Sequence, residues 1–358
     1  MNIITLPRFF LPHVHLREYE MMKIVAPMII DNQLFSGATA MGNTSILIET
    51  ALQALDYKSK AYAYAGLNKI TDFDLIIPIM LTRNTTKKII RDAFDRGIRF
   101  IKFLPDQVST NAGSGVTLAD TDFYFPLFRY AQELGMIVLI HAELGKDRHG
   151  NIILLEDREA QAIPLIRKII KTFPNLVIII EHVSTKGMVD LVNRSKNVFA
   201  TVTVQHMLIT FGDVKNPNGT IKTPENFCLP IVKTERDRTA ILKEVLGGNP
   251  KFFFAPDFAP HPWEQKTLQN PKAGVAVLPL EMISEVVEIF DRYNAWNKLP
   301  NFISVFGRSV YGLELDKKTI TLVRKPRIIP KHDVIANFKH GQTTNWTVIE
   351  FNQKIGQY

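Results

Sequence analysis

The alternation of short apolar runs with longer amphipathic stretches most constrains the fold of this 358-residue chain. Its apolar runs are rich in Ile, Val, Leu and Phe, as in strands of a parallel sheet buried on both faces. They span residues 9–16, 35–41, 74–81, 98–104, 136–141, 176–182, 197–205 and 251–257. The stretches between and after them predict helices at about 44–56, 85–96, 121–134, 157–172, 185–194, 235–247 and 278–293. This α/β order favours a (β/α)8 TIM-type barrel over a doubly wound sheet.

The end of the chain predicts a small addition to the barrel rather than a second unit. Two β-like pieces, 319–323 and 346–351, are joined by a Pro- and Lys-rich link. They are too short for an independent domain, so we expect them to pack on the barrel. Residues 1–358 are therefore predicted to form one domain, with the barrel at about 7–315 and a C-terminal extension at about 316–358.

Composition excludes several classes of protein. Hydrophobic residues make up 46% and charged residues 22%, which is ordinary for a soluble globular protein. The net charge of +8 comes from basic residues interleaved with apolar ones, without a nucleic-acid motif, so no nucleic-acid partner is expected. The single Cys228 excludes an internal disulfide framework and suits a reducing compartment. With no apolar run near ~20 residues and no signal-peptide pattern, we expect a cytoplasmic protein without a membrane partner.

Two histidines close the first apolar run. His13 and His15 are separated by one residue, and in a strand such residues share a face. An H-x-H pair by itself is also common on protein surfaces. Here it follows the first strand, and barrel active sites are built at the C-terminal ends of the strands. The position therefore favours a metal site.

Lys102 lies inside the apolar segment RFIKFLP, where its amine must be desolvated unless a partner neutralises it. One interpretation is a lysine that extends to the barrel mouth. The other is a neutral amine that takes up CO₂ and becomes an anionic carbamate ligand, because burial lowers the pKa of a lysine. His141, His182 and Asp257 end the fifth, sixth and eighth runs. This set of N and O ligands suits zinc and tolerates cobalt or manganese.

From about residue 7 to about residue 350, these segments resemble the dihydroorotases of the amidohydrolase superfamily, in particular the short bacterial type without a β-sandwich domain. The matching motifs are His13-Val14-His15-Leu16-Arg17, Lys102-Phe103-Leu104-Pro105, Ser109-Thr110-Asn111 with Gly115-Val116-Thr117, His141-Ala142-Glu143, Glu181-His182, Cys228-Leu229-Pro230 and Asp257-Phe258-Ala259-Pro260-His261. They follow the family's order and spacing.

The resemblance implies two divalent metals per chain, normally zinc, with cobalt or manganese as substitutes. One metal would be held by His13, His15 and Asp257, and the other by His141 and His182. Lys102, as N6-carboxylysine, would bridge them together with a hydroxide. The substrate carboxylate would be bound by Arg17, Asn43 and His261. The backbone of Leu229 would contact the pyrimidine ring, and Ser109 and Thr110 would belong to a lid.

The implied reaction is the zinc-dependent interconversion of (S)-dihydroorotate and N-carbamoyl-L-aspartate in pyrimidine (UMP) biosynthesis. In it, the metal-bridging hydroxide attacks the ring amide carbonyl. Asp257 accepts the hydroxide's proton and passes it to the departing ring nitrogen. The partner is therefore a small molecule, and a homodimer is the family-like expectation.

Two other functions are open at this stage. A related amidohydrolase could open a hydantoin, a dihydropyrimidine or allantoin, but those rings lack the exocyclic carboxylate that Arg17 and His261 would bind. A catalytically inactive barrel could act as a scaffold, although every implied metal ligand is present here. Phe258 departs from the small residue common after the metal-binding aspartate. Strand alternation predicts that its ring points away from Asp257.

Overall fold

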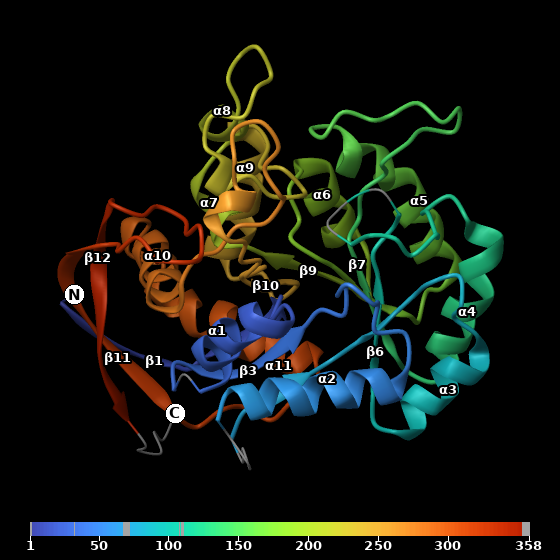
Figure 1. The fold of residues 1–358 in the computed structure, drawn as a ribbon, viewed down its shortest axis with the longest axis horizontal. Helices are drawn as coiled ribbons and strands as arrows, with labels where there is room; N and C mark the ends of the chain where they lie inside the picture. Colours follow the sequence, from blue (N-terminus) through green and yellow to red (C-terminus); the bar gives the residue numbers. More distant parts are fainter. Residues whose placement is uncertain (1, 32, 67–71, 107, 109–110, 353–358) are drawn as a thin grey trace.

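The computed structural model describes residues 2–31, 33–66, 72–106, 108 and 111–352, and it confirms the predicted barrel (Figure 1). Neighbouring strands of the barrel pair in parallel, in the orders β2-β3-β4 and β5 to β10. These strands are β2 (Phe9–Val14), β3 (Phe35–Ala40), β4 (Asp74–Ile76), β5 (Ile79–Met80), β6 (Phe100–Phe103), β7 (Ile137–Ile140), β8 (Val177–Ile180), β9 (Val198–Val202) and β10 (Phe252–Phe254).

The third predicted run, residues 74–81, is divided into two strands. Its first part, β4, pairs with β3, and its second part, β5, pairs with β6. Pro78 lies between them and has no N–H for a ladder hydrogen bond. The two sheets also meet where the end of β2 lies beside the segment that follows β10. There, Val14 forms a parallel bridge with Phe258, and the N–H of His15 donates to the Phe258 carbonyl at 2.8 Å. These contacts join the two sheets into one ring.

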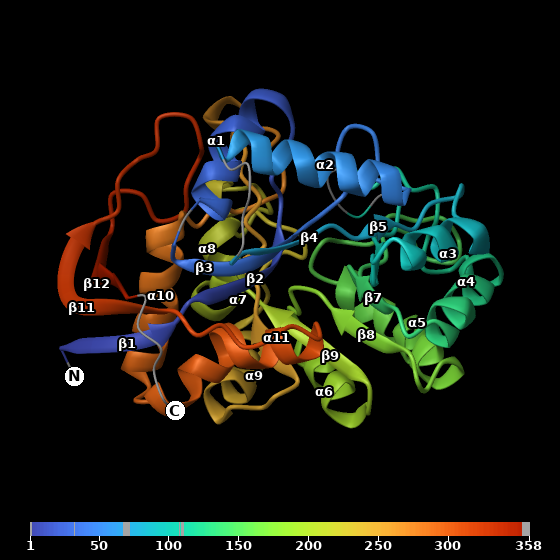
Figure 2. The same ribbon diagram turned by 90° about the horizontal axis from the view of Figure 1, so that it is seen from below.

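Helices surround this ring (Figures 1 and 2). The longer ones are α1 (Tyr19–Ile30), α2 (Ala51–Tyr64), α3 (Lys87–Asp95), α4 (Thr121–Glu133), α5 (Arg158–Thr172), α6 (Lys186–Arg194), α9 (Glu235–Gly247) and α10 (Pro279–Arg292). Shorter ones are α7 (Val204–Leu208), α8 (Phe211–Val214) and α11 (Phe306–Val310). Threonine caps start α3, α6 and α9, each accepting a hydrogen bond from a first-turn N–H. Within the described residues, no helix has the length and apolarity to span a bilayer.

Two of the longer helices differ from the sequence prediction, and the short α7, α8 and α11 were not predicted. α1 was not predicted, because it is mostly apolar, contains Pro27 and begins without a capping side chain. The helix expected at 44–56 begins only at Ala51, so its predicted bounds were wrong. Thr50 and Gln53 form a capping box there, which marks the true start.

A second, antiparallel sheet lies beside the barrel in the order β1-β11-β12 (Figure 2). It contains β1 (Ile3–Pro7), β11 (Thr319–Ile328) and β12 (Thr343–Asn352). Both β-like pieces of the tail are therefore strands, whereas β1 was not predicted. β12 packs on α10, where the Ser284 hydroxyl donates to the carbonyl of the buried Trp346 at 2.6 Å. The small sheet thus draws on both ends of the chain.

Candidate functional site

The barrel interior changes from apolar to polar within one step along its strands. Its N-terminal end is filled by a buried cluster that includes Phe10, Phe100, Leu139, Ile179, Phe253 and Tyr311. Side chains in a strand alternate, so the residues two positions further on also face inward. These positions are Lys102 on β6, His141 one residue past the end of β7 and Glu181 one residue past the end of β8, and all three are buried. The polar layer therefore forms at the C-terminal end, where barrel active sites lie.

An extra residue in β2 turns the first two histidines inward. From Leu11 to Val14, β2 advances three residues while the paired segment of β3 advances two. Phe10 faces the interior, so uninterrupted alternation would point His13 outward. The extra residue reverses the facing of the strand beyond it. His13 and His15 consequently face the site together.

His13, His15 and Asp257 converge on one point. The Nε2 atom of His15 lies 3.2 Å from Oδ1 of Asp257, and Nε2 of His13 lies 3.3 Å from the same oxygen. The two histidine Nε2 atoms are themselves 3.3 Å apart. Their ligand atoms all lie within 4.8 Å of one another, which suits a single bound cation.

A backbone turn brings His182 to the same place. Its φ is 42°, in the left-handed region, two residues after the end of β8. This turn interrupts the alternation, so Glu181 and His182 both reach the interior. The His182 ring lies 5.2 Å from the His13 ring and 4.6 Å from the His141 ring, measured between centroids. The four histidines therefore form one continuous group.

The buried carboxylate of Glu181 joins the site, although the sequence predicted no ligand or substrate role for it. Its Oε1 lies 3.0 Å from Nδ1 of His13, and its Oε2 contacts Nζ of Lys102. Strand parity could have found it, because Ile179 faces inward two residues earlier. Among the described residues, neither Glu181 oxygen nor Nδ1 of His182 makes a well-formed hydrogen bond. Buried polar atoms of this kind fit a cation as their partner.

Burial sets the charge states of this group. It lowers the pKa of His13, His141 and His182 well below the usual value, so their imidazoles are neutral and offer lone pairs. Burial also lowers the pKa of Lys102 to about 7, although Asp257 opposes this shift. Burial would raise the pKa of Asp257, but its hydrogen bond with His15 and the nearby His182 and Lys102 bring it below the usual value. Neutral imidazoles beside a carboxylate and a depressed lysine are suited to a divalent cation.

A second buried carboxylate holds His141 in place. Oε2 of Glu143 lies 2.7 Å from Nε2 of His141, and both side chains are buried. Such a contact fixes the orientation of an imidazole and leaves its other nitrogen for a ligand. For His141, that atom is Nδ1.

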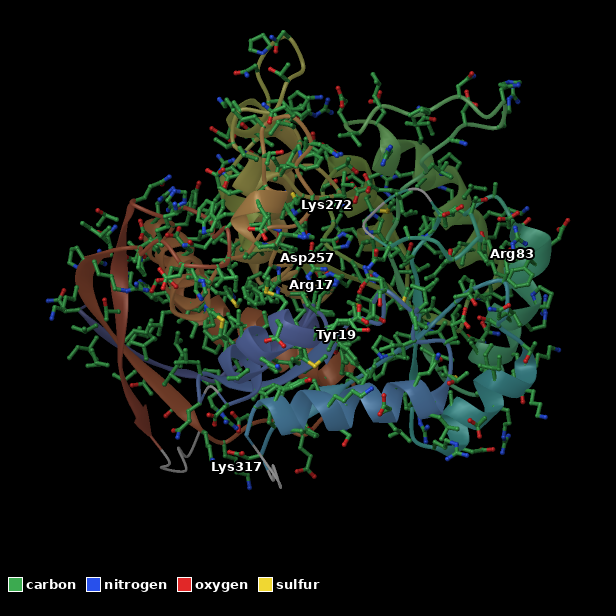
Figure 3. The ribbon with its side chains drawn as sticks, in the orientation of Figure 1. Arg17, Tyr19, Arg83, Asp257, Lys272 and Lys317 are labelled. Atoms are coloured by element: carbon green, nitrogen blue, oxygen red, sulfur yellow. The ribbon has the colours of Figure 1, made fainter. Side chains whose placement is uncertain are left out.

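Arg17 and His261 pair at the mouth of the barrel. β2 ends at Val14, so Arg17 does not continue the strand and instead adopts a φ of 62°. Its Nε donates to the Pro260 carbonyl at 2.9 Å, and its Nη2 donates to Nε2 of His261 at 3.0 Å. Burial, with Arg17 adding to the effect, lowers the pKa of His261 to about 3. Asp257 acts electrostatically on Arg17, and Figure 3 labels the two residues in the same region, so a cation lies beside the group of histidines and Asp257.

The structure gives fewer contacts for the remaining predicted residues. Asn43 follows the end of β3, is buried, and accepts a hydrogen bond on its carbonyl from Nδ2 of Asn111 at 3.1 Å. Leu229 is partly exposed in the loop before α9. Ser109 and Thr110 lie outside the described residues.

Phe258 behaves as strand alternation predicts. Its ring is fully buried in the main hydrophobic core, whereas Asp257 faces the histidines. Asp257 has a φ of 43°, so the chain turns directly where the carboxylate enters the site. The phenylalanine therefore fills space behind the strand and does not narrow the site.

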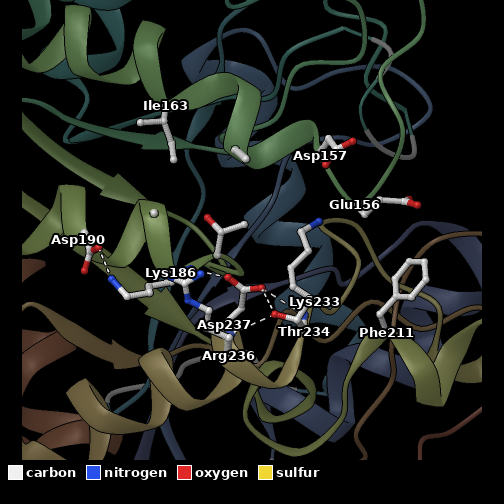
Figure 4. Close-up of a pocket in the computed structure, with 13 residues that line it drawn as sticks. Glu156, Asp157, Ile163, Lys186, Asp190, Phe211, Lys233, Thr234, Arg236 and Asp237 are labelled. Atoms are coloured by element: carbon white, nitrogen blue, oxygen red, sulfur yellow. Dashed lines mark hydrogen bonds and ion pairs between the residues drawn. The ribbon is translucent and has the colours of Figure 1, made fainter.

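A separate surface hollow of about 780 Å³ lies among α5, α6 and the start of α9 (Figure 4). Both of its lysines have partners there: Lys186 pairs with Asp190 at 2.5 Å, and Lys233 donates to the Leu155 carbonyl at 3.0 Å. Asp237 accepts from the backbone N–H of Lys186 at 2.8 Å. None of the predicted site residues lines this hollow.

Comparison with known proteins gives consistent matches over nearly the whole chain. It is 33% identical over 326 residues to a probable dihydroorotase of Schizosaccharomyces pombe, covering 91% of each chain. It is 32% identical over 346 residues to a dihydroorotase of Shewanella sediminis, covering 94% of this chain and 96% of that one. The crystal structure of Saccharomyces cerevisiae dihydroorotase with 5-fluoroorotic acid superposes with a TM-score of 0.88 at 29% identity, covering 99% and 100% of the two chains. No family model matches the chain.

Proposed function

The chain belongs to the dihydroorotase family, hydrolases that act on a cyclic amide, and from this we propose that it interconverts (S)-dihydroorotate and N-carbamoyl-L-aspartate in pyrimidine biosynthesis. The observation that carries this proposal is the convergence of His13, His15 and Asp257 with His182 at the C-terminal end of the barrel. The charged Arg17 beside them suits a substrate with a carboxylate.

We assign two zinc ions to the site. His13, His15 and Asp257 would hold one ion and His141 and His182 the other, with Lys102 as N6-carboxylysine between them. The donors are neutral imidazoles and carboxylates, which zinc accepts and which cobalt or manganese could share. Divalent ions bound there would polarise the amide carbonyl and make water a nucleophile near neutral pH.

Asp257 would move the proton. Its Oδ1 already lies within 3.3 Å of two imidazoles, and its pKa is held below the usual value, so it is ionised and can accept. In ring opening, water adds to the amide carbonyl, its proton goes to Asp257, and the C–N bond breaks as that proton reaches the ring nitrogen. Ring closure runs the same steps in reverse.

Arg17 and His261 would bind the substrate carboxylate, with Asn43 beside them. A guanidinium matches a carboxylate with two parallel hydrogen bonds, which a lysine does not reproduce. Burial lowers the pKa of Arg17 to about 10, so it remains charged at neutral pH. Hydantoins, dihydropyrimidines and allantoin lack this carboxylate, and the pair therefore favours dihydroorotate.

The rest of the proposal concerns the setting of the site. The Leu229 backbone would contact the ring, and Ser109 and Thr110 would belong to a lid over it. We further propose a single-domain, cytoplasmic chain that acts as a homodimer on a small molecule, with neither nucleic acid nor membrane as partner.

The test is ring opening and closure by the purified full-length protein supplied with zinc and bicarbonate. We expect turnover in both directions, two metals per chain, and loss of activity with a chelator that zinc restores. Two bound metals without turnover of either compound would exclude this substrate pair and favour another cyclic amide. The absence of both bound metal and turnover would overturn the enzyme proposal and favour a scaffold.

A further inference from the structure

Lys266 is a buried lysine outside the group of proposed metal and substrate ligands. It follows a short 3-10 turn, Trp263–Gln265, and its side chain is only 5% exposed. Its Nζ donates to three backbone carbonyls: Phe227 at 3.0 Å, Lys272 at 2.9 Å and Gly274 at 2.6 Å. A buried lysine ordinarily needs an anionic partner, so three carbonyl partners call for an explanation.

Those carbonyls belong to two loops that meet at the mouth. Phe227 stands two residues before Leu229, and the N–H of Gly274 also donates to the Phe227 carbonyl at 2.9 Å. Lys266 therefore ties the loop at 227–229 to the loop at 272–274. Three carbonyls require three N–H donors, which only the ammonium form supplies. Burial lowers the pKa of Lys266 to about 7, whereas the three carbonyls favour the protonated form that donates to them.

The loop at 272–274 packs closely against Ala259 and His261, at the proposed carboxylate site. A Cβ on Gly274 would come within 2.7 Å of the Ala259 carbonyl oxygen and 3.1 Å of Cδ2 of His261. Gly274 also has a φ of +143°, so only glycine fits this close approach. The Ala273 carbonyl lies 3.0 Å from Nε2 of His261, the atom that Arg17 also contacts.

We propose that Lys266 is a positioning residue for substrate recognition: its ammonium group joins the loop that carries Leu229 to the loop that backs His261, and so sets the geometry of the carboxylate and ring contacts. This inference rests on the proposed function. The substrate carboxylate lies away from the amide that reacts. Weaker contacts to this carboxylate should therefore reduce binding of the ground state and of the transition state by similar amounts. Substrate affinity should therefore fall more than the rate of the chemical step.

The chain offers a matched control at the opposite end of the barrel. Lys251 directly precedes β10, and its Nζ also donates to three backbone carbonyls: Ser195, and Lys196 and Val198 at 3.1 Å each. These acceptors lie at or just before the start of β9, far along the strands from the ligand group. Replacing Lys251 removes the same number of backbone contacts without touching the mouth.

The experiment compares zinc-loaded wild type, Lys266→Met, Lys266→Gln and Lys251→Met by steady-state kinetics, metal content and thermal midpoint. For Lys266→Met we expect KM for dihydroorotate to rise about 10-fold or more, with kcat within about threefold and two metals retained. Lys266→Gln keeps two N–H donors and should give an intermediate KM. Lys251→Met should lower the thermal midpoint and leave KM unchanged.

Other outcomes overturn the inference. An unchanged KM in Lys266→Met, or an equal rise in Lys251→Met, would show that Lys266 does not position the substrate contacts. If Lys266→Met does not fold, Lys266→Gln decides in the same way. Failure of both to fold would make Lys266 a determinant of stability alone. An inactive wild type would overturn the proposed function itself, whereas an active wild type with a normal variant KM overturns only this inference.

Discussion

The two ends of the barrel interior use the same strands for opposite purposes. At the N-terminal end, Phe100 stacks on Tyr311 with ring centroids 4.6 Å apart, and Phe10 meets the same ring edge-on at 5.2 Å. Two residues further along β6, the inward side chain is Lys102, pressed against Glu181. Two residues along a strand, about 7 Å, therefore separate an aromatic layer from a charged layer.

The comparison separates the layer of the interior that stabilises the fold from the layer that carries the candidate site. The aromatic layer satisfies its packing internally and requires no partner. The charged layer leaves buried Glu181 and His182 atoms without well-formed hydrogen bonds in the described chain, a cost that a bound cation would offset. Substitutions at the two ends should accordingly separate loss of folding from loss of metal and activity.

Lys102→Ala should give the largest effect, because it removes the proposed anionic bridge. We expect kcat/KM to fall about 10³-fold or more, on the scale of losing a central electrostatic stabiliser, with loss of metal. Zinc analysis and turnover measure this. Lys251→Ala, which removes a lysine at the opposite end of the barrel from the ligands, is the control. Full activity in Lys102→Ala would contradict the carboxylysine assignment.

Phe253→Ala tests the other end. The ring is fully buried beneath the site, so we expect a loss of about 3–5 kcal/mol in the free energy of unfolding from the cavity created. Urea unfolding of the metal-loaded protein measures it, with the exposed Leu154→Ala as control. Folded Phe253→Ala should keep kcat within about tenfold, because no ligand is lost. A larger fall in kcat than in stability would mean that the two layers are not separable.

Arg17→Met should act on substrate binding alone. Losing a charge-assisted contact of about 1.5–3 kcal/mol raises KM for dihydroorotate about 10- to 100-fold. Metal content should stay at the wild-type value, because Arg17 is not among the proposed metal ligands. The exposed Arg91→Met, on α3, controls for loss of an arginine. Metal loss in Arg17→Met would place this residue in the metal centre instead.

Glu181→Gln should weaken metal binding rather than substrate binding. It keeps the size of the side chain but removes the charge beside His13 and Lys102, and we expect zinc affinity to fall about 10- to 100-fold. Competition with a metal-binding dye reports the affinity. Glu159→Gln is the matched control, because this equally buried glutamate contacts the N–H and hydroxyl of Ser184 rather than the ligands. Equal losses in both variants would argue against a specific role for Glu181.

Much of the architecture could be predicted from the sequence, because eight apolar runs and their caps are local signals. The polar strand ends could be predicted too, since a histidine or lysine beside an apolar run is visible without coordinates. No role was predicted for Glu181, because its run ends one residue later at His182 and that terminal histidine is the stronger metal-ligand signal. β1 was missed because its pairing with β11 joins segments more than 300 residues apart.

The sequence by itself determined which chemical groups stand at the strand ends and therefore the class of site. Only the tertiary structure decided which way they face. The extra residue in β2 turns His13 inward, and left-handed backbone at Arg17, His182 and Asp257 aims three further groups at one mouth. Such departures from strand geometry cost local energy and persist because the surrounding packing holds them, so no periodicity in the sequence reveals them.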